Sequence, residues 1–81
     1  MYYIYLLQCA DNSIYTGITT DVERRFKEHK EGTASKYTKA HKAVKIIYTE
    51  ESKNRSEASK REIEIKKMQR EEKLKLAVKF S

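Results

Sequence analysis

Apolar side chains fill both faces of the first stretch of the chain, and a short polar break separates it from a second apolar stretch. Residues 2–8 (YYIYLLQ) carry aromatic or aliphatic side chains on both alternating faces, which is typical of a central strand covered on both sides. Residues 14–19 (IYTGIT) are rich in β-branched and aromatic residues, and Asp11-Asn12-Ser13 before them is a turn signal. The pattern predicts a β-hairpin.

A helix is expected directly after the hairpin. Thr20, with Glu23 three residues later, fits a capping box and predicts Thr20 as the N-cap. Val22 and Phe26 are four residues apart, so they form an apolar stripe on one face of this helix. Gly32 is expected to end the helix, because glycine readily adopts the left-handed conformation that closes many helices.

A second, longer helix is expected in the last third of the chain. Asn54, followed by Glu57, is another capping box, and the pattern after it predicts a helix to about Met68. Ala58, Ile65 and Met68 fall on one face, which is therefore the face expected to pack on the rest of the protein.

Three weaker patterns complete the organisation of the chain. Residues 43–48 (AVKIIY) predict a third strand, residues 34–40 a short helix, and residues 74–80 (LKLAVKF) a final short helix. The principal order is strand, strand, helix, strand, helix. We therefore expect one α+β domain over residues 1–81, with a small, mostly antiparallel three-stranded sheet flanked by helices.

Charge is distributed unevenly along the chain. The 18 lysines and arginines outnumber the 12 acids, giving a net charge of +6, yet no lysine or arginine lies in residues 1–20. This basic character suits nucleic acid, and a solvated lysine-rich surface is the alternative reading. The residues from 36 to 45 are the most basic segment, with Lys36, Lys39, Lys42 and Lys45.

Cysteine content and hydropathy narrow the class of protein. The single cysteine, Cys9, excludes an internal disulfide and is expected to be a core residue. No apolar run approaches the roughly 18 residues that a membrane span needs, and no basic segment precedes the first apolar stretch as in a signal peptide. We expect a cytoplasmic protein with no membrane contact.

Three groups of residues have the chemistry of a functional site. Arg25 and His29 lie four apart on the first helix, where an arginine could hold a phosphate and a histidine could move a proton; two ordinary surface side chains are the alternative. Glu62 lies on the apolar side of its helix, so its carboxylate needs a partner, either a divalent metal or a lysine or arginine. Tyr5 and Tyr15 are either core aromatics or site residues whose hydroxyls converge beside Gly17.

The order and spacing of these residues resemble the GIY-YIG nuclease superfamily. Its Gly-Ile-Tyr signature corresponds to Tyr3-Ile4-Tyr5, and its Tyr-Ile-Gly signature to Tyr15-Thr16-Gly17, so a tyrosine replaces the first glycine and a threonine the second isoleucine. Arg25 matches the family's helix arginine, with Arg24 as its neighbour. His29 matches a histidine found in part of the family, and Glu62 the metal-binding glutamate. The resemblance covers about residues 2–68 and is greatest to the small single-domain UPF0213 subgroup.

This resemblance implies an endonuclease that hydrolyses phosphodiester bonds in DNA, in repair or recombination. It implies that Glu62 holds one Mg²⁺ or Mn²⁺ and that Arg25 binds the phosphate. Tyr15, helped by Tyr5, would take the proton of the attacking water if the tyrosine pKa is lowered, and His29 would assist as a relay or phosphate ligand. Gly17 would leave room beside the tyrosines. Side chains expected to contact nucleic acid are Arg24, Lys36, Lys39, Lys42 and Lys45.

The alternative is a module on the same fold that binds nucleic acid, or a protein, without cleaving it; with either function we expect a monomer. The asparagine that many family members carry beyond the glutamate has no counterpart here, because the only asparagines are Asn12 and Asn54.

Overall fold

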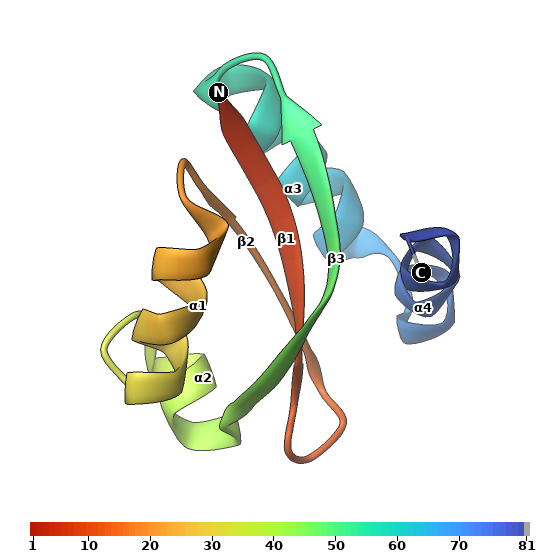
Figure 1. Ribbon diagram of the computed structural model, residues 1–81. Coiled ribbons are helices and arrows are strands. Elements are labelled where there is room, and N and C mark those ends of the chain that lie inside the picture. Colours follow the sequence, from red (N-terminus) through yellow and green to blue (C-terminus); the bar gives the residue numbers. More distant parts are fainter. Residues whose placement is uncertain (81) are drawn as a thin grey trace.

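A three-stranded antiparallel sheet forms the centre of the computed structural model, which describes residues 1–80 (Figure 1). Its strands are β1 (Tyr2–Cys9), β2 (Ile14–Thr19) and β3 (Ala43–Ser52), in the spatial order β2-β1-β3. The central position predicted for the first strand is therefore confirmed. Between residues 1 and 80, no helix combines the length and apolar character needed to cross a bilayer.

Two pairs of helices cover the two faces of the sheet (Figure 1). The helices α1 (Val22–Glu31) and α2 (Lys36–His41) lie on one side, and α3 (Arg55–Lys67) and α4 (Arg70–Phe80) lie on the other. The predicted α+β organisation is confirmed, with both short helices present. The last helix begins earlier than predicted, because its first turn is charged (Arg-Glu-Glu) and has no apolar residue to mark it.

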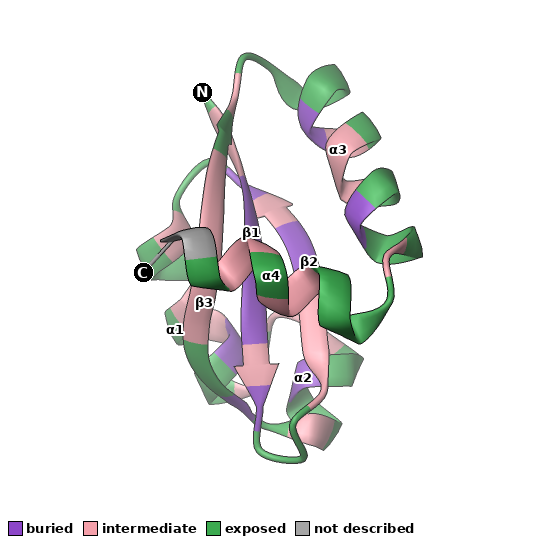
Figure 2. Cartoon of the chain, turned by 90° about the vertical axis from the view of Figure 1, so that its right-hand side faces the viewer, coloured by how far each residue is buried: buried purple, intermediate pink, exposed green. Residues whose placement is uncertain are grey.

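Alternate side chains of β1 build two separate apolar clusters, and β1 is the most buried strand (Figure 2). Ile4 and Leu6 are fully buried on the face covered by α3, where they pack with Ala58 and Ile65. Tyr5 and Leu7 form the other cluster, and the partly buried Val22 and Phe26 of α1 pack against it. A strand buried on both sides must be apolar on both faces, which explains the continuous apolar run at residues 4–7.

The N-cap predicted for the first helix was wrong by one residue. Asp21, not Thr20, is the N-cap of α1, and its carboxylate accepts a hydrogen bond from the backbone N–H of Arg24 at 3.1 Å. The hydroxyl of Thr19 accepts the N–H of Asp21 at 3.1 Å and thereby fixes the approach to the helix. A carboxylate caps as well as a hydroxyl and adds a negative charge at the positive end of the helix dipole.

Two other predicted helix ends are confirmed. Gly32 closes α1 in the left-handed conformation, with φ of 81°, and its N–H and that of Thr33 bond back to the carbonyls of His29 and Glu28. Asn54 caps α3 by accepting the N–H of Glu57 at 2.9 Å.

The third strand is longer than predicted, extending to Ser52 rather than residue 48. Its polar second half pairs through the backbone with the beginning of β1, where Tyr2 lies opposite Ser52. One polar side chain there has a specific partner: Glu50 accepts two hydrogen bonds from the Arg61 guanidinium of α3, at 2.8 and 3.2 Å. Backbone pairing and this ion pair replace the apolar alternation that marks most strands.

Replacing Thr16 by valine is expected to raise the free energy of unfolding by about 1 kcal/mol. Thr16 is 3% exposed, and its hydroxyl has no hydrogen-bond partner among the residues that the structure describes. Valine has nearly the same shape and removes this unpaired group. Urea denaturation measures the difference in the free energy of unfolding.

The matched change Thr19→Val is expected to lower stability by about 1 kcal/mol, because it removes the hydroxyl that holds Asp21. Equal effects of both changes would contradict this account.

Candidate functional site

A small pocket of about 160 Å³ opens at the edge of the sheet formed by β2. Gly17 lies on β2 directly opposite Tyr5 of β1, so the two strands bring the two signature segments side by side. Glycine leaves the space that the tyrosine hydroxyl needs. The lining residues come from both faces of the sheet and from the α1–α2 loop, and they are Tyr5, Tyr15, Gly17, Ile18, Arg25, His29, Ala34 and Glu62.

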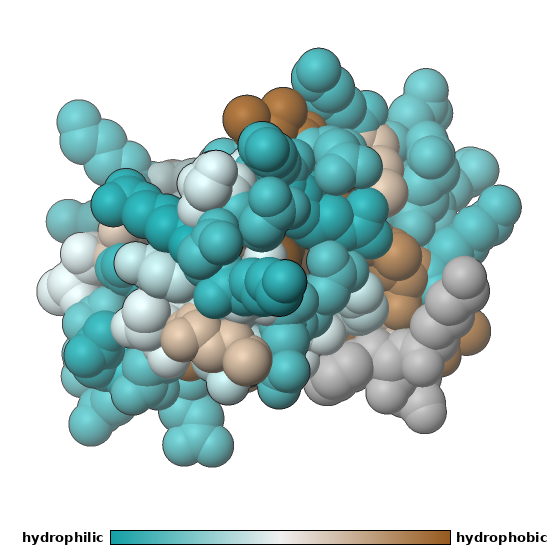
Figure 3. Space-filling model, turned by 90° about the horizontal axis from the view of Figure 1, so that it is seen from above, coloured by the Kyte–Doolittle hydropathy of each residue, from teal (hydrophilic) through white to brown (hydrophobic). Residues whose placement is uncertain are grey.

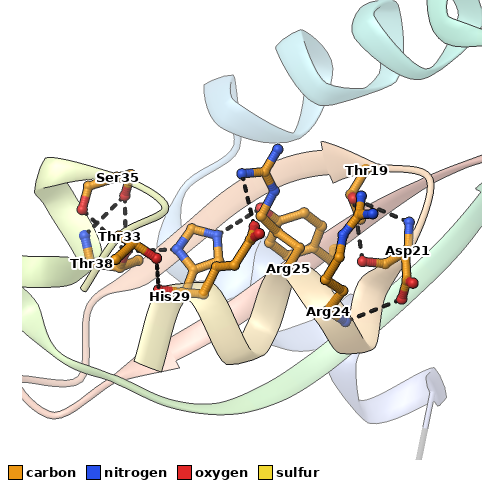
Figure 4. Close-up of polar contacts among 10 residues, drawn as sticks. Thr19, Asp21, Arg24, Arg25, His29, Thr33, Ser35 and Thr38 are labelled. Atoms are coloured by element: carbon orange, nitrogen blue, oxygen red, sulfur yellow. Dashed lines mark hydrogen bonds and ion pairs between the residues drawn. The ribbon is translucent and has the colours of Figure 1, made fainter. Parts of the chain in front are cut away.

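A chain of hydrogen bonds leads from this pocket into the protein. The Tyr5 hydroxyl lies 2.8 Å from Nε2 of His29, and Nδ1 of the same ring lies 2.6 Å from the Thr38 hydroxyl. The Thr38 hydroxyl lies 2.9 Å from that of Ser35. Figure 4 shows His29 on the same helix as Arg25, with Thr38 of α2 and the preceding Ser35 on its other side. Both ring nitrogens of His29 therefore have partners.

Burial determines the protonation states of both Tyr5 and His29, which share the first hydrogen bond of this chain. His29 is 1% exposed, and this burial, followed by the nearby Arg25 cation, lowers the pKa of its imidazole. Tyr5 is 2% exposed, and burial, followed by Tyr15, raises the pKa of its hydroxyl well above the usual value. Near neutral pH both groups are uncharged. Tyr5 therefore does not meet the condition of a lowered tyrosine pKa that the expected mechanism included. The alternative in which His29 is an ordinary surface side chain is wrong.

Tyr15 contributes its ring rather than a defined hydrogen bond. Its ring centre lies 4.9 Å from that of His29 and 6.3 Å from that of Tyr5. On the outer side it lies 5.7 Å from the ring of Tyr37, which stacks on His41. These contacts cover one side of the pocket with aromatic surface.

Arg25 points toward the pocket, whereas Arg24 lies outside it. The Arg25 side chain is 38% exposed and its guanidinium is 3.3 Å from the carboxylate of Glu28 on the same helix. Arg24 lines a neighbouring groove of about 280 Å³ that Arg25 also borders, together with Arg55. The end of the molecule that carries the N-terminus is largely hydrophilic (Figure 3). A basic groove beside a polar pocket suits a phosphate chain.

Glu62 reaches the pocket from α3, on the other side of the sheet. Its side chain is 20% exposed and pairs with Lys66 at 3.4 Å. No group of three or more metal-ligating side chains occurs within residues 1–80. A single carboxylate nevertheless fits Mg²⁺, which keeps several waters and shares its coordination with substrate phosphates. Glu62 is therefore the residue of the pocket that could hold such a cation.

The four lysines expected to contact nucleic acid do not share one surface. Lys36 and Lys39 belong to α2, and Lys39 and Lys42 line a groove between the two helices on that side of the sheet. Lys45 lies opposite Gln8 on β1 and lines a groove beside α4 instead. Lys45 therefore lies on the other face of the sheet from Lys39 and Lys42, and contact of all four lysines with one nucleic acid stays a prediction.

A family model described as the GIY-YIG catalytic domain matches residues 1–75. The chain belongs to the GIY-YIG family. The match confirms the resemblance seen in the tyrosine signatures. It also covers every strand, both helices that contribute to the pocket, and the hydrogen-bonded chain from Tyr5 to Ser35.

Relatives of this GIY-YIG domain come from bacteria and archaea. A UPF0213 protein of Staphylococcus haemolyticus is 47% identical over 75 residues, covering 93% of this chain and 92% of the relative. A UPF0213 protein of Haloquadratum walsbyi is 47% identical over 76 residues, covering 94% and 85%. The solution NMR structure of a UPF0213 protein from Bacillus halodurans matches with a TM-score of 0.59 and 39% identity, covering 96% of this chain and 84% of that one. The domain therefore belongs to the UPF0213 group.

Two residues of the GIY-YIG pocket region were missed from the sequence, Thr38 and Ser35. The available signal was a cap: Ser35 is the N-cap of α2 and accepts the N–H of Thr38 at 3.1 Å. The pattern Ser-x-x-Thr thus predicts the helix start. It does not predict that the threonine hydroxyl also turns inward to a histidine nine residues earlier.

Lowering the pH from about 7 to about 5 is expected to destabilise the GIY-YIG domain through His29. Burial holds the pKa of His29 below its usual value in the folded state, whereas in the unfolded chain it lies near about 6.5. The unfolded state therefore binds more protons as the pH falls through about 6.5, and stability is lost from there downward. The slope reaches at most about 1.4 kcal/mol per pH unit for one proton. Urea denaturation across this range measures it.

The matched pair His29→Gln and His41→Gln tests this assignment. The first change is expected to flatten the dependence on pH in this range, and the second to leave the loss in place. A slope that survives His29→Gln unchanged would assign it to another group.

Proposed function

We propose that this GIY-YIG domain is a metal-dependent endonuclease that hydrolyses phosphodiester bonds in DNA. The observation that carries the proposal is the hydrogen bond of 2.8 Å between the Tyr5 hydroxyl and the buried Nε2 of His29. This bond ends in a pocket that also contains Arg25 and Glu62. An uncharged histidine linked through a hydroxyl to a polar pocket is equipped to remove a proton from water. Family membership supports phosphodiesters as the substrate.

Arg25 is the group that binds the phosphate in this proposal. Its guanidinium can donate two parallel hydrogen bonds to non-bridging oxygens, and its charge opposes the negative charge that they gain in the transition state. Binding a phosphate competes with the contact to Glu28, which is exposed and therefore weak. Arg24 and Arg55 in the neighbouring groove, and Lys36, Lys39 and Lys42 around α2, would hold the backbone farther from the cut. Such contacts bind without regard to base sequence.

Proton removal passes through Tyr5 in this proposal. As the water oxygen bonds to phosphorus, its proton moves to the Tyr5 oxygen while the Tyr5 proton moves to Nε2 of His29. The bond from phosphorus to the leaving oxygen breaks, and that oxygen takes a proton from solvent. Because burial raises the pKa of Tyr5, Tyr5 passes on its own proton as it receives that of the water and does not become a tyrosinate. His29 carries the resulting positive charge until it returns the proton to solvent. Tyr15, assigned the leading role from the sequence, orients the water and shields the ring of His29.

A divalent ion, Mg²⁺ or Mn²⁺, held by Glu62 would stabilise charge on the phosphate and on the leaving oxygen. Glu62 would exchange its ion pair with Lys66, which is half-exposed, for the metal. We include in this proposal a monomeric, cytoplasmic protein that acts in DNA repair or recombination. The family resemblance supports the role, and the composition supports the location.

A second candidate function is a module that binds nucleic acid without cleaving it. The Glu62–Lys66 ion pair favours this reading, because it already neutralises the one carboxylate that lines the pocket among the described residues.

One experiment separates the two functions. Plasmid, single-stranded DNA and RNA are incubated with Mg²⁺, with Mn²⁺ and with EDTA, and binding in EDTA is measured separately by fluorescence anisotropy. Metal-dependent cleavage that is lost in Arg25→Gln but keeps its kcat in Arg24→Gln, with at most a higher KM, supports the nuclease. Binding without cleavage under every condition would refute it and favour the second candidate. In that binding assay, Lys36→Ala combined with Lys39→Ala tests the α2 surface, and Lys45→Ala is the control from the opposite face.

A further inference from the structure

We propose that Thr38 and Ser35 are positioning residues that hold neutral His29 with its hydrogen on Nδ1, so that Nε2 faces Tyr5 as an acceptor. The tautomer follows from hydrogen bonds alone. Its consequence for catalysis rests on the proposed function, because a relay through Tyr5 requires an unprotonated Nε2.

The Thr38 hydroxyl can accept a hydrogen bond from His29, because its own hydrogen has an acceptor in Ser35. It is fully buried, with 1% of the residue exposed, and lies 2.6 Å from Nδ1 of His29. On its other side it reaches the Ser35 hydroxyl at 2.9 Å and the Ser35 carbonyl at 3.5 Å. A hydroxyl has one hydrogen and two lone pairs. When Thr38 donates that hydrogen to Ser35, its oxygen is free to receive Nδ1–H.

The opposite tautomer leaves the Tyr5 hydrogen without an acceptor among the side chains that the structure describes. With the hydrogen on Nε2, the ring would donate to the Tyr5 oxygen, and the Tyr5 hydrogen would need an acceptor elsewhere. Among the described residues, His29 is the side chain to which the Tyr5 hydroxyl is bonded. The hydroxyl oxygen lies against the backbone of Gly17, where a Cβ would be 2.5 Å away. With the hydrogen on Nδ1, every member of the chain from Tyr5 to Ser35 has a partner.

The backbone between the two helices keeps Thr38 in place. The N–H groups of Gly32 and Thr33 bond to carbonyls in the last turn of α1 at 3.1 and 3.0 Å, which reverses the chain toward its own helix. Ser35 then caps α2 by accepting the N–H of Thr38 at 3.1 Å. One serine hydroxyl therefore both starts the helix and orients the threonine that contacts His29.

Long-range ¹H–¹⁵N NMR of the histidine rings tests the assignment, because it distinguishes the protonated from the unprotonated ring nitrogen. In the full-length wild-type protein at neutral pH, we expect Nδ1 of His29 to carry the hydrogen. Thr38→Val keeps the shape but removes the acceptor, so we expect the population to move toward the Nε2–H form. Thr38→Ser keeps a hydroxyl, so we expect the wild-type tautomer to return. Tyr5→Phe leaves Thr38 intact and is expected to retain Nδ1–H.

Cleavage kinetics supply the functional readout. Thr38→Val is expected to lower kcat for DNA by about 10²-fold, the lower end of what a positioned proton-transfer group contributes. KM is expected to stay nearly unchanged, because Thr38 is only 1% exposed, although it borders the groove that Lys39 and Lys42 line. Thr38→Ser is expected to recover most of the rate.

Each outcome decides the proposal. A wild-type spectrum with the hydrogen on Nε2 overturns it, even if Thr38→Val does not fold. It is also overturned if Thr38→Val folds and keeps the wild-type tautomer, or if Tyr5→Phe alone changes the tautomer. A protein that cleaves no nucleic acid but shows the expected tautomers would refute the proposed nuclease and leave the positioning of His29 standing.

Discussion

Replacing Gly17 by alanine is expected to destabilise the protein by about 2 kcal/mol and to lower DNA cleavage by about 10²-fold or more. A Cβ at this position would lie 2.5 Å from the hydroxyl oxygen of Tyr5 and 2.7 Å from its Cζ. Real carbon atoms do not approach that closely, so one group must move. The backbone of Gly17 is paired with β1, and therefore the tyrosine ring is the group that has to shift.

The ring of Tyr5 cannot shift without cost. It is 2% exposed and packs in the cluster with Leu7, and its hydroxyl is bonded to His29 at 2.8 Å. Moving the ring breaks that hydrogen bond and strains a packed core, which is the reason for expecting both a loss of stability and a loss of activity. Urea denaturation and the plasmid cleavage assay measure the two effects on one preparation.

The chain's other glycine provides the control. Gly32 adopts φ of 81°, but a Cβ there would meet its nearest neighbour, Cγ of Lys39, at an ordinary 3.4 Å. Gly32→Ala is therefore expected to cost about 1 kcal/mol through backbone strain alone and to leave cleavage nearly unchanged. If Gly17→Ala has wild-type stability and activity, the close approach of Tyr5 to β2 is wrong.

Replacing Glu62 by glutamine is expected to reduce metal-dependent cleavage by about 10³-fold while changing the free energy of unfolding by less than about 0.5 kcal/mol. The amide keeps the size of the side chain but loses the negative charge that a divalent ion requires. Stability is expected to change little, because the ion pair lost with Lys66 is half-exposed at the lysine. Cleavage is measured over a range of Mn²⁺ concentrations, and Mn²⁺ binding is measured in the presence of an uncleavable DNA analogue.

Glu64→Gln is the matched control for this experiment. Glu64 lies two residues away on α3, its side chain is 64% exposed, and its contact is to Arg61 at 3.8 Å rather than to the pocket. This variant is expected to cleave at nearly the wild-type rate. Equal losses in both variants would indicate a general effect of charge on DNA binding, and full activity in Glu62→Gln would remove Glu62 from the proposed metal site.

Local sequence patterns predicted the framework of the pocket because strong local preferences produce it. The apolar character of residues 2–8 on both faces required a central strand, and β1 occupies the centre of the sheet. The return strand then places Gly17 opposite Tyr5. Glu62 follows from helical spacing, since it lies four residues after the buried Ala58. Each of these inferences depends on neighbours within about four positions or on one short hairpin.

Features that depend on contacts between distant segments could not be predicted in the same way. Helical spacing puts His29 near the face of Val22 and Phe26, but it does not predict full burial, because the covering residue, Thr38, belongs to the next helix. The face on which Lys45 lies could not be predicted, because alternation alone does not fix the register of β3. Its pairing with β1 shifts between Leu6 and Leu7, so that Tyr48 faces the first and Ile46 the second.

The bidentate contact between Arg61 and Glu50 has a mechanical consequence for the carboxylate next to it. Apolar contacts of Ala58 and Ile65 hold α3 on the sheet but permit it to roll, since they have no direction. The two hydrogen bonds at 2.8 and 3.2 Å do have a direction and lock the helix against β3. Because Arg61 directly precedes Glu62 in α3, the same contact fixes the rotation of the helix segment that presents Glu62 to the pocket. The polar half of the edge strand β3 thus helps to position the carboxylate of Glu62.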